Sequence, residues 1–375
     1  MRYIKLTPLD TLFFRDGSPF NAGETGQMEV KSVFPPSANT VVGCLRAAFA
    51  RELGWLGHGR WKKDITDQLG DGAALAPLSF EGPHLLCHDR LLFPVPNHLL
   101  YKGKASKVDC SKPVDSTEPQ DEDGIDQLTF LRPSDEPLHT DIGLVRLPST
   151  KPEEEGFKNL EQAYVTCEGM CKILQGQLPD TKAIIKSKNL WGSEPRIGIH
   201  RDDTSRTTKD DAMYQVVHTR LARGVSLAMG VAGYDGKTPK LATLGGESRM
   251  VWLEETSPWH IPAFQPESQN DILRYTVVFI TPAQLPNDSW KKPEGTLPDL
   301  PGRIVSACVG KPVLMGGWDS NSNTPQALEP YLPAGSVFFM EAPASDVKNI
   351  ESKHNTKIGN KTAWGYGHIL IGAWA

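Results

Sequence analysis

The chain has 375 residues, with 40 Lys and Arg against 45 Asp and Glu, which gives a formal net charge of -5. This balance excludes a protein that coats nucleic acid by bulk charge, so any site for a polyanion must be local. The length allows two domains with substantial cores. Six thinly spread cysteines without a CxxC pair indicate reduced thiols. Because no signal peptide and no apolar run of about 18 residues is present, we expect a soluble, cytoplasmic protein with no membrane partner.

The N-terminal segment predicts a strand followed by a capped helix. Residues 3–6 form a strand that Pro8 stops, and residues 12–17 carry a second run into an Arg-Asp-Gly turn. A helix is then predicted from a proline pair, a serine cap and an apolar stripe at helical spacing, ended by a glycine. The residues concerned are Pro35, Pro36, Ser37, Val42, Leu45, Phe49, Leu53 and Gly54.

From residue 83 to about residue 189 the periodicity weakens, and we interpret residues 85–190 as a partly flexible insertion. Its acidic stretch resembles a calcium loop only superficially, because the spacing and the terminal glutamate of such a loop are missing. We therefore expect a solvated acidic loop here.

Regular structure returns as two strands on either side of a polar finger. Residues 196–200 and 213–221 have strand composition, and residues 201–211 between them are polar and basic. A further strand is predicted at residues 225–231. The Gly-Gly turn at residues 244–249 then leads into another strand, and the composition of residues 258–270 indicates a linker.

The C-terminal part predicts a second β-rich unit, which ends in a glycine and aromatic loop at residues 364–368 followed by a strand. A dinucleotide fingerprint needs its glycines between a strand and a helix, and a phosphate loop needs a lysine followed by Ser or Thr. Neither is present, so no cofactor is predicted. Both units open on a strand ended by Thr-Pro, which hints at two related α+β units.

The sequence holds no convincing catalytic or metal motif. His84 and His88 have the spacing of a helical metal-binding pair, with Cys87 between them, but the glutamate of a zinc protease motif is missing, and we predict no metal site. No GxSxG elbow occurs. Several histidines leave a metal-independent ribonuclease open, since the sequence cannot place two of them together.

Scattered basic side chains instead suit a phosphate backbone that crosses the surface. They lie at a strand edge, in a glycine-containing loop, on the capped helix and around the polar finger: Arg15, Lys31, Arg46, Arg196, Arg201, Arg206 and Lys209. Tyr366 and His368 offer flat rings for stacking an unpaired base. For each residue, a solvated charge or a packing aromatic ring stays an open alternative.

Several motifs together resemble the third subunit of the Cmr complex, the type III-B CRISPR effector. They are residues 8–20 (PLDTLFFRDGSPF), residues 34–37 (FPPS) with Thr40, Gly43, Leu45 and Arg46, residues 196–199 (RIGI) before Met213 and Tyr214, and residues 244–249 (LGGESR). The glycine tail is similar to the C-terminal loop of the wider RAMP superfamily. The resemblance covers nearly the whole chain except the insertion.

The resemblance implies an α+β fold of two ferredoxin-like, RRM-related domains, at residues 1–256 with the insertion and at residues 271–375. It also implies a non-catalytic subunit that holds the 5′ tag of the CRISPR RNA beside the large polymerase-like subunit and other RAMP subunits. The finger would be the RAMP thumb, carrying Arg201, Arg206 and Lys209, and Arg15 and Arg46 would lie near the tag. The predicted RNA-binding residues are Arg15, Lys31, Arg46, Arg196, Arg201, Arg206, Lys209, Arg249, Gly365, Tyr366, Gly367 and His368.

Two other functions stay open at this point. Some RAMP relatives are metal-independent endonucleases that trim precursor CRISPR RNA, and a protein scaffold without any RNA contact is also compatible with the sequence. The net charge of -5 favours a subunit held in place by neighbours, because free affinity for RNA would be modest.

Overall fold

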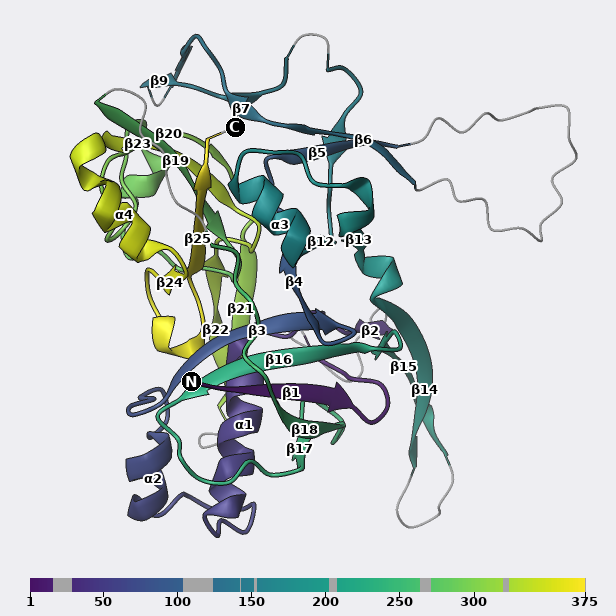
Figure 1. Cartoon of the computed structure of the whole chain (residues 1–375). Helices are drawn as coiled ribbons and strands as arrows, with labels where there is room; N and C mark the ends of the chain where they lie inside the picture. The colour runs from purple at the N-terminus through teal and green to yellow at the C-terminus, as the bar shows by residue number, and fades with distance from the viewer. Residues whose placement is uncertain are drawn as a thin grey trace, which may run out of the picture.

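A computed structural model describes residues 1–15, 29–103, 124–141, 143–151, 154–201, 208–263, 271–319 and 324–374. Strands predominate, with few helices, as Figure 1 shows. Within these ranges no helix is long and apolar enough to cross a membrane.

The first half of the chain builds an eight-stranded antiparallel sheet. Its order is β13-β12-β4-β3-β16-β1-β18-β17. The strands are β1 (Arg2–Pro8), β3 (Ser79–Cys87), β4 (Arg90–Pro94), β12 (Ala163–Thr166), β13 (Ile184–Lys186), β16 (Val225–Ala232), β17 (Leu241–Thr243) and β18 (Met250–Thr256). Strand β1 ends at the predicted proline. The expected insertion is partly integral to this sheet, because β4, β12 and β13 extend it beyond β3.

Helix α1 (Ala38–Glu52) packs on this sheet and confirms the predicted capped helix. The Ser37 side chain accepts a hydrogen bond from the Thr40 amide, and Gly54 follows the helix with a φ of 93°. Val41, Leu45 and Phe49 face the core and are fully buried. They form one hydrophobic cluster with strand residues that include Ile4 and Leu6. The shorter helix α2 (Lys63–Leu69) packs beside α1 (Figure 1).

The second half builds a five-stranded antiparallel sheet of order β20-β23-β19-β25-β24. The strands are β19 (Ile272–Phe279), β20 (Arg303–Cys308), β23 (Val337–Pro343), β24 (Thr356–Lys357) and β25 (His368–Ala373), and helix α4 (Val347–Lys353) lies between β23 and β24 in the chain. The apolar run of β19 is buried on both faces, which suits its central place.

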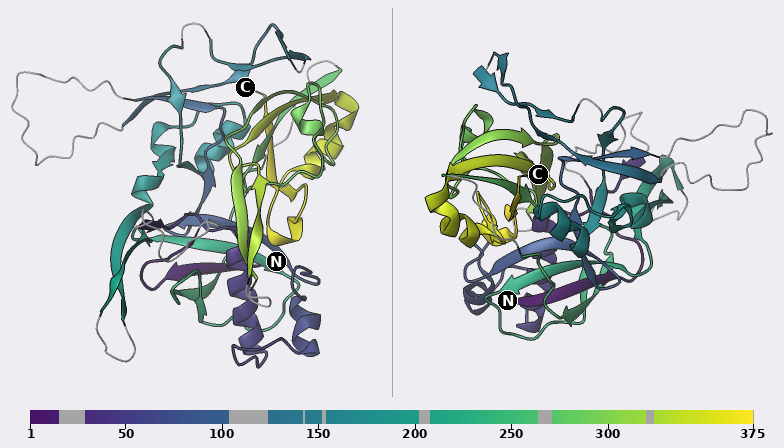
Figure 2. Two further views of the ribbon diagram at one scale, coloured as in Figure 1. Left: turned by 180° about the vertical axis from the view of Figure 1, so that it is seen from behind. Right: turned by 45° about the horizontal axis from the view of Figure 1, so that its top comes forward.

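A continuous hydrophobic cluster joins the two sheets. Phe93 and Val165 come from the eight-stranded sheet, and Phe339 and Leu370 come from the five-stranded one. Helix α3 (Cys167–Leu174) contributes Met170, Ile173 and Leu174 to the same cluster. Figure 2 shows α3 close to β25 from a second direction.

The remaining strands form small sheets at the surface. They are β2 (Glu29–Lys31), β5 (Leu99–Gly103), β6 (Ile125–Phe130), β7 (Arg132–Pro133), β8 (Leu138–Thr140), β9 (Gly143–Val145), β10 (Pro148–Ser149), β11 (Lys158–Asn159), β14 (Trp191–Arg201), β15 (Thr208–Leu221), β21 (Val313–Asp319) and β22 (Thr324–Tyr331). The 3₁₀ turns are η1 (Thr181–Ala183), η2 (Ser187–Asn189), η3 (Ser289–Lys291), η4 (Ala344–Asp346) and η5 (Thr362–Trp364).

The C-terminal glycine loop is a turn between η5 and β25, in the predicted order of turn and then strand. Gly365 has a φ of 100°, and a Cβ there would lie 2.3 Å from the Gly82 carbonyl oxygen on β3. Gly367 has a φ of 72°, and a Cβ there would lie 1.9 Å from the Ile358 carbonyl oxygen. Only glycine fits either position, because both the backbone angle and the space exclude a side chain.

We predict opposite effects for two glycine-to-alanine changes. Gly367→Ala should lower the free energy of unfolding by at least about 2 kcal/mol, since it adds left-handed strain to a backbone clash. Gly43 lies in the middle of α1, and an added methyl group there would meet no atom within 4 Å apart from the helix's own backbone, so Gly43→Ala should raise that free energy by about 0.5–1 kcal/mol. Urea unfolding of both variants tests this, and effects of the same sign would contradict it.

Candidate nucleic-acid interface

The predicted polar finger is a long hairpin formed by β14 and β15. Their antiparallel register runs from Trp191 opposite Leu221 to Arg201 opposite Thr208. The predicted hairpin is therefore confirmed, although residues 202–207, with Arg206, lie outside the described residues. Figures 1 and 2 show the hairpin projecting past the eight-stranded sheet.

Strand β2 adds a third, parallel strand to the hairpin. Val30 pairs with Val216, which itself lies opposite Arg196, so these three residues form one row across the sheet. Lys31 pairs with Val217 in the next row. Arg15 precedes β2 in the chain and is bridged to Ser32, which follows β2.

An ion-pair network holds the base of this hairpin. Glu194, Arg196 and Arg220 share one face, because the register places Glu194 and Arg196 two residues apart and Arg220 opposite Gly192. Arg196 Nη2 lies 2.8 Å from both Asp10 Oδ2 and Glu194 Oε1. Arg220 Nη2 lies 2.9 Å from Asp10 Oδ1, and Arg220 Nε also bonds Glu194. Asp10, just after β1, therefore ties the hairpin to the main sheet.

The Gly-Gly turn at residues 244–249 packs against the same network. Arg249 reaches Asp10 Oδ2 at 3.6 Å and Glu247 Oε2 at 3.3 Å. Glu247 Oε2 also lies 2.9 Å from His218 Nε2, while His218 Nδ1 lies 2.9 Å from the Thr11 hydroxyl. Burial lowers the pKa of His218, which favours the neutral ring. The Nδ1 atom of that ring then accepts from the Thr11 hydroxyl, while Nε2 lies beside the Glu247 carboxylate without a well-aligned hydrogen bond.

The charges of this network cancel, since three guanidiniums (Arg196, Arg220 and Arg249) meet three carboxylates (Asp10, Glu194 and Glu247). The hydrogen bonds from Arg196 and Arg220 lower the pKa of Asp10 to about 2. Those from Arg220 and Arg196 likewise lower the pKa of Glu194 to about 2. Two of the predicted RNA-binding residues, Arg196 and Arg249, thus meet in a neutral cluster that positions the hairpin.

The structure gathers a second group of predicted residues along the hairpin and its neighbours. Arg201 ends β14, Lys209 lies near the start of β15, Lys31 ends β2, and Arg15 is bridged beside β2. Three of these positions lie in the three-stranded sheet, and the bridge to Ser32 connects Arg15 to it. The sequence motifs alone placed them in three separate contexts.

Arg46 lies elsewhere and faces the interior, contrary to its expected place near the RNA. It is 7 % exposed, and its guanidinium donates to the carbonyl oxygens of Leu69, Gly70 and Gly72 at 2.9–3.0 Å. The Trp61 ring centroid lies 5.1 Å from its Cζ. Arg46 therefore anchors the end of α2 to α1, and we leave it out of the RNA-binding set.

The rings expected to stack on a base are also buried. Tyr366 is 0 % exposed and packs on Tyr331 with 4.8 Å between ring centroids. His368 is 1 % exposed, and its Nε2 lies 2.7 Å from Asn355 Oδ1. The glycine loop turns both side chains inward because its backbone is pressed against β3. Stacking by Tyr366 or His368 is therefore ruled out in this conformation.

The histidine pair at His84 and His88 is not helical. His84 belongs to β3, and His88 lies in the following turn with a φ of 49°. The helical spacing of the pair has no structural meaning in a strand.

A comparison of the chain with models of protein families shows which family it belongs to. The model of the CRISPR-associated protein family Cas_Cmr3 matches residues 4–374. The chain belongs to the Cas_Cmr3 family. The predicted resemblance to the third Cmr subunit, of the RAMP type, is thereby confirmed. No curated protein matches the chain.

Solved structures show a related fold for this Cas_Cmr3 chain. A chain in the cryo-EM structure of the type III-B Cmr-beta complex bound to cognate target RNA has 15% identity and a TM-score of 0.50, with 98% of this chain and 96% of that chain covered. A chain of the same complex with cognate target RNA and AMPPnP has 15% identity and a TM-score of 0.46, covering 90% and 86%. The first of these two chains shows the shared fold.

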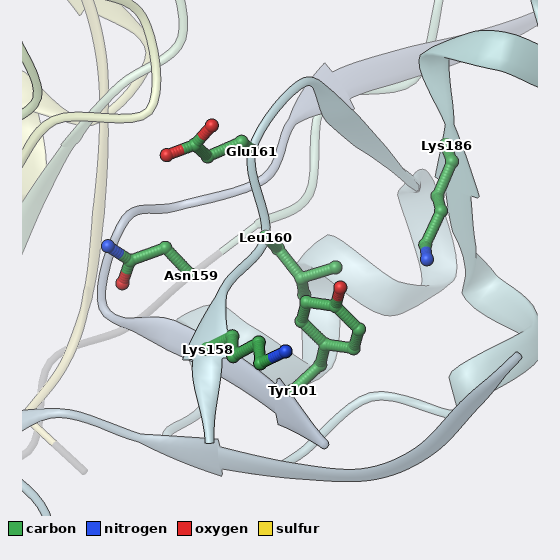
Figure 3. A pocket seen from close by; sticks show the side chains of 6 residues that line it. All are labelled: Tyr101, Lys158, Asn159, Leu160, Glu161 and Lys186. Carbon is green, nitrogen blue, oxygen red and sulfur yellow. The ribbon is translucent and has the colours of Figure 1, made fainter. Parts of the chain in front are cut away.

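The Cas_Cmr3 chain also has an open pocket of about 370 Å³ among β5, β11 and β13, which sequence reasoning missed. It is lined by Tyr101, Lys158, Asn159, Leu160, Glu161 and Lys186, shown in Figure 3. Lys186 Nζ lies 4.9 Å from the centroid of the Tyr101 ring, which is a cation–π distance. No sequence signal joins these residues, because Tyr101 and Lys186 belong to different sheets that meet only in the folded chain.

The ion pairs at the base of the Cas_Cmr3 hairpin predict how the free energy of unfolding changes at acidic pH. The folded-state pKa of Asp10 lies below its usual value of 3.8, so its ion pairs stabilise the fold above that pH and are lost as the pH falls toward 2. Asp10 is half-exposed, so Asp10→Asn should lower the free energy of unfolding by about 1 kcal/mol or less at pH 7. Urea unfolding should show this difference shrinking between about pH 4 and pH 2.

The exposed Asp235 offers a matched control. Asp235→Asn should change the free energy of unfolding little at either pH. A cost of Asp10→Asn that persists unchanged at pH 2 would show that the carboxylate charge is not what stabilises the hairpin.

Proposed function

We propose that this chain is a non-catalytic RNA-binding subunit of a type III-B CRISPR effector, which holds the 5′ tag of the CRISPR RNA and docks the large polymerase-like subunit. The observation that carries the proposal is the three-stranded sheet β14-β15-β2, which brings Arg15, Lys31, Arg201 and Lys209 onto connected segments. Basic residues on neighbouring segments of one sheet suit the binding of a sugar–phosphate backbone. The refined set for RNA contact is Arg15, Lys31, Arg201, Arg206 and Lys209.

We further propose that both halves are ferredoxin-like RAMP domains, and strand order supports this. In the first sheet, β1 is flanked by β16 and β18, with β3 beyond β16 and α1 on the path from β1 to β3. In the second, β19 is flanked by β23 and β25, with β20 beyond β23. When the four strands of each set are numbered by their place in the chain, their order across the sheet is 4-1-3-2. This is the antiparallel order of the ferredoxin-like split βαβ fold.

In this proposal the glycine loop holds the two halves of the chain in place and does not contact the RNA directly. Gly365 presses the C-terminal turn onto Gly82 of β3 and so joins one half to the other, while Gly367 lies against the Ile358 backbone within the C-terminal half. Its amides contribute to RNA binding only indirectly, by fixing the sheet that carries the hairpin.

The ribbon of β21 and β22 supports the protein-docking part. The two strands pair from Val313 opposite Tyr331 to Asp319 opposite Thr324. Leu314 is 61% exposed and Leu328 is 42% exposed on this ribbon. Exposed apolar side chains on a projecting ribbon are typical of a surface that another subunit covers.

Burial of histidines supports a role without catalysis. An RNA-cleaving acid and base must reach the ribose and the phosphate. His84, His98 and His368 are each at most 3% exposed, and burial lowers the pKa of all three. These three are therefore unsuited as the acid and base in this conformation, which leaves only more exposed histidines such as His58 and His260 for the endonuclease alternative.

The hairpin proposal predicts a change in salt dependence. In the assembled effector complex, the double change Arg206→Ala and Lys209→Ala should weaken retention of the CRISPR RNA. Because each phosphate contact to a single strand contributes about 0.7 to the slope of log K against log salt, the slope should fall by about 1.4. Filter binding across a salt series measures it, and crosslinking of the 5′ tag to this subunit should decrease in parallel.

Exposed lysines near α2 provide the control. Lys62→Ala with Lys63→Ala removes the same charge from a distant surface, and should leave the slope and the crosslinks unchanged. Crosslinking of the tag that is unaffected by the hairpin changes would count against the thumb assignment. If the wild-type subunit gives no crosslink at all, a pure protein scaffold is the better description.

The enzyme alternative predicts a distinct result with the purified chain. Labelled CRISPR repeat RNA incubated in EDTA should stay intact, since no accessible acid–base pair is proposed. Specific cleavage that is lost on changing single histidines would overturn the non-catalytic role.

A further inference from the structure

Three side chains with metal-binding atoms meet where the two sheets touch. Glu81 and His84 come from β3, and His368 begins β25. The carboxylate oxygen and ring nitrogens that they offer all lie within 4.8 Å of one another. His84 is 3% exposed and His368 is 1% exposed, so the group is built into the interior.

A β-bulge in β3 accounts for the placement of Glu81 and His84. In a regular strand, residues three apart point to opposite faces. Here His84 pairs with Ala228 and Glu81 pairs with Gly230, so three steps along β3 match two along β16. The extra residue brings both side chains to the same face, and such bulges occur next to functional sites.

Two ring nitrogens in this group have no hydrogen-bond partner. They are His84 Nε2 and His368 Nδ1, and both are buried. The other nitrogen of His368, Nε2, lies 2.7 Å from Asn355 Oδ1, an oxygen that only accepts. Nε2 therefore carries the proton, and Nδ1 presents a bare lone pair to the interior. A partner carbonyl or carboxylate on the far nitrogen is the usual support of a metal-binding histidine.

We propose that Glu81, His84 and His368 bind a divalent transition-metal ion of the zinc class, which fastens β25 to β3. Two imidazoles with one carboxylate are a donor set that Zn²⁺ accepts. Ligands about 2.1 Å from a tetrahedral ion are about 3.4 Å apart, so atoms that lie within 4.8 Å of one another reach this geometry by side-chain adjustments of up to about 1.4 Å. The site bridges the two halves of the chain and is independent of the RNA-binding surface.

Neighbouring groups fix the carboxylate and limit the affinity. The Trp259 indole donates to Glu81 Oε1 at 3.2 Å, which uses one of the two oxygens. Lys357 Nζ is held nearby by the Phe80 carbonyl at 2.6 Å and the Ser79 hydroxyl at 3.2 Å. Its positive charge opposes a bound cation. We therefore expect an ion that a strong chelator removes and that returns when the metal is added back.

The wild-type chain gives the first test. After dialysis against EDTA and reconstitution with Zn²⁺, elemental analysis should find about one zinc per chain, and its melting temperature should rise above that of the metal-free chain. Co²⁺ in place of zinc should give visible d–d bands of a four- or five-coordinate site without a thiolate charge-transfer band. A chain that takes up no metal, or cobalt spectra with thiolate ligation, would overturn the proposal.

Single substitutions give the second test, with a buried histidine as control. His84→Gln and His368→Gln should each lose the bound zinc and the zinc-dependent rise in melting temperature. Asn355→Ala should keep the site but weaken it about 10–100-fold. His98 is equally buried and also has an unpartnered ring nitrogen, so His98→Gln should retain full zinc. Retention of zinc by both ligand variants overturns the assignment, and if they do not fold, the wild-type cobalt spectrum decides.

Discussion

The close contact of the C-terminal turn with β3 sets the relation between the two sheets. The backbone at Gly365 meets the carbonyl oxygen of Gly82, and the Thr281 hydroxyl accepts from the His368 amide and donates to the Gly365 carbonyl at 2.9 Å each. Strand β25 then continues directly into the five-stranded sheet, between β19 and β24. One short segment therefore contacts both halves, and Leu370 of the strand that follows it packs in the hydrophobic cluster between the sheets together with α3.

The base of the β14–β15 hairpin follows a different principle, since charge rather than apolar packing fixes it. Asp10 lies just after β1 and accepts from both Arg196 and Arg220. A single exposed ion pair contributes little, but a bidentate network that shares carboxylates restrains the hairpin's direction. The network therefore fixes the direction in which the hairpin projects, and it neutralises the charges of Arg196 and Arg220 at the hairpin base.

Local signals in the sequence were enough for some of this architecture. Ser37 and Gly54 bound α1 because caps and helix-ending glycines act within one turn of the chain, and the hairpin follows from two strand-like runs around a polar span. The roles of Arg46, Tyr366 and His368 were beyond such reasoning. Whether a polar side chain faces RNA or an interior carbonyl depends on segments far away in the sequence. Glu81 and His84 meet His368 only because a bulge and a glycine turn coincide in space.

The neutral network also bears on how such a subunit can hold RNA. The chain carries a net charge of -5, and the arginines at the hairpin base add no net positive charge to the surface. A few basic residues on the outer hairpin give modest affinity by themselves. On the proposed function, neighbouring subunits of the assembly also hold the RNA, so each further contact forms at a high effective concentration. On the same proposal, a few basic residues beside the charge-neutral base of the hairpin are sufficient, and their small number limits binding of unrelated RNA by the free chain.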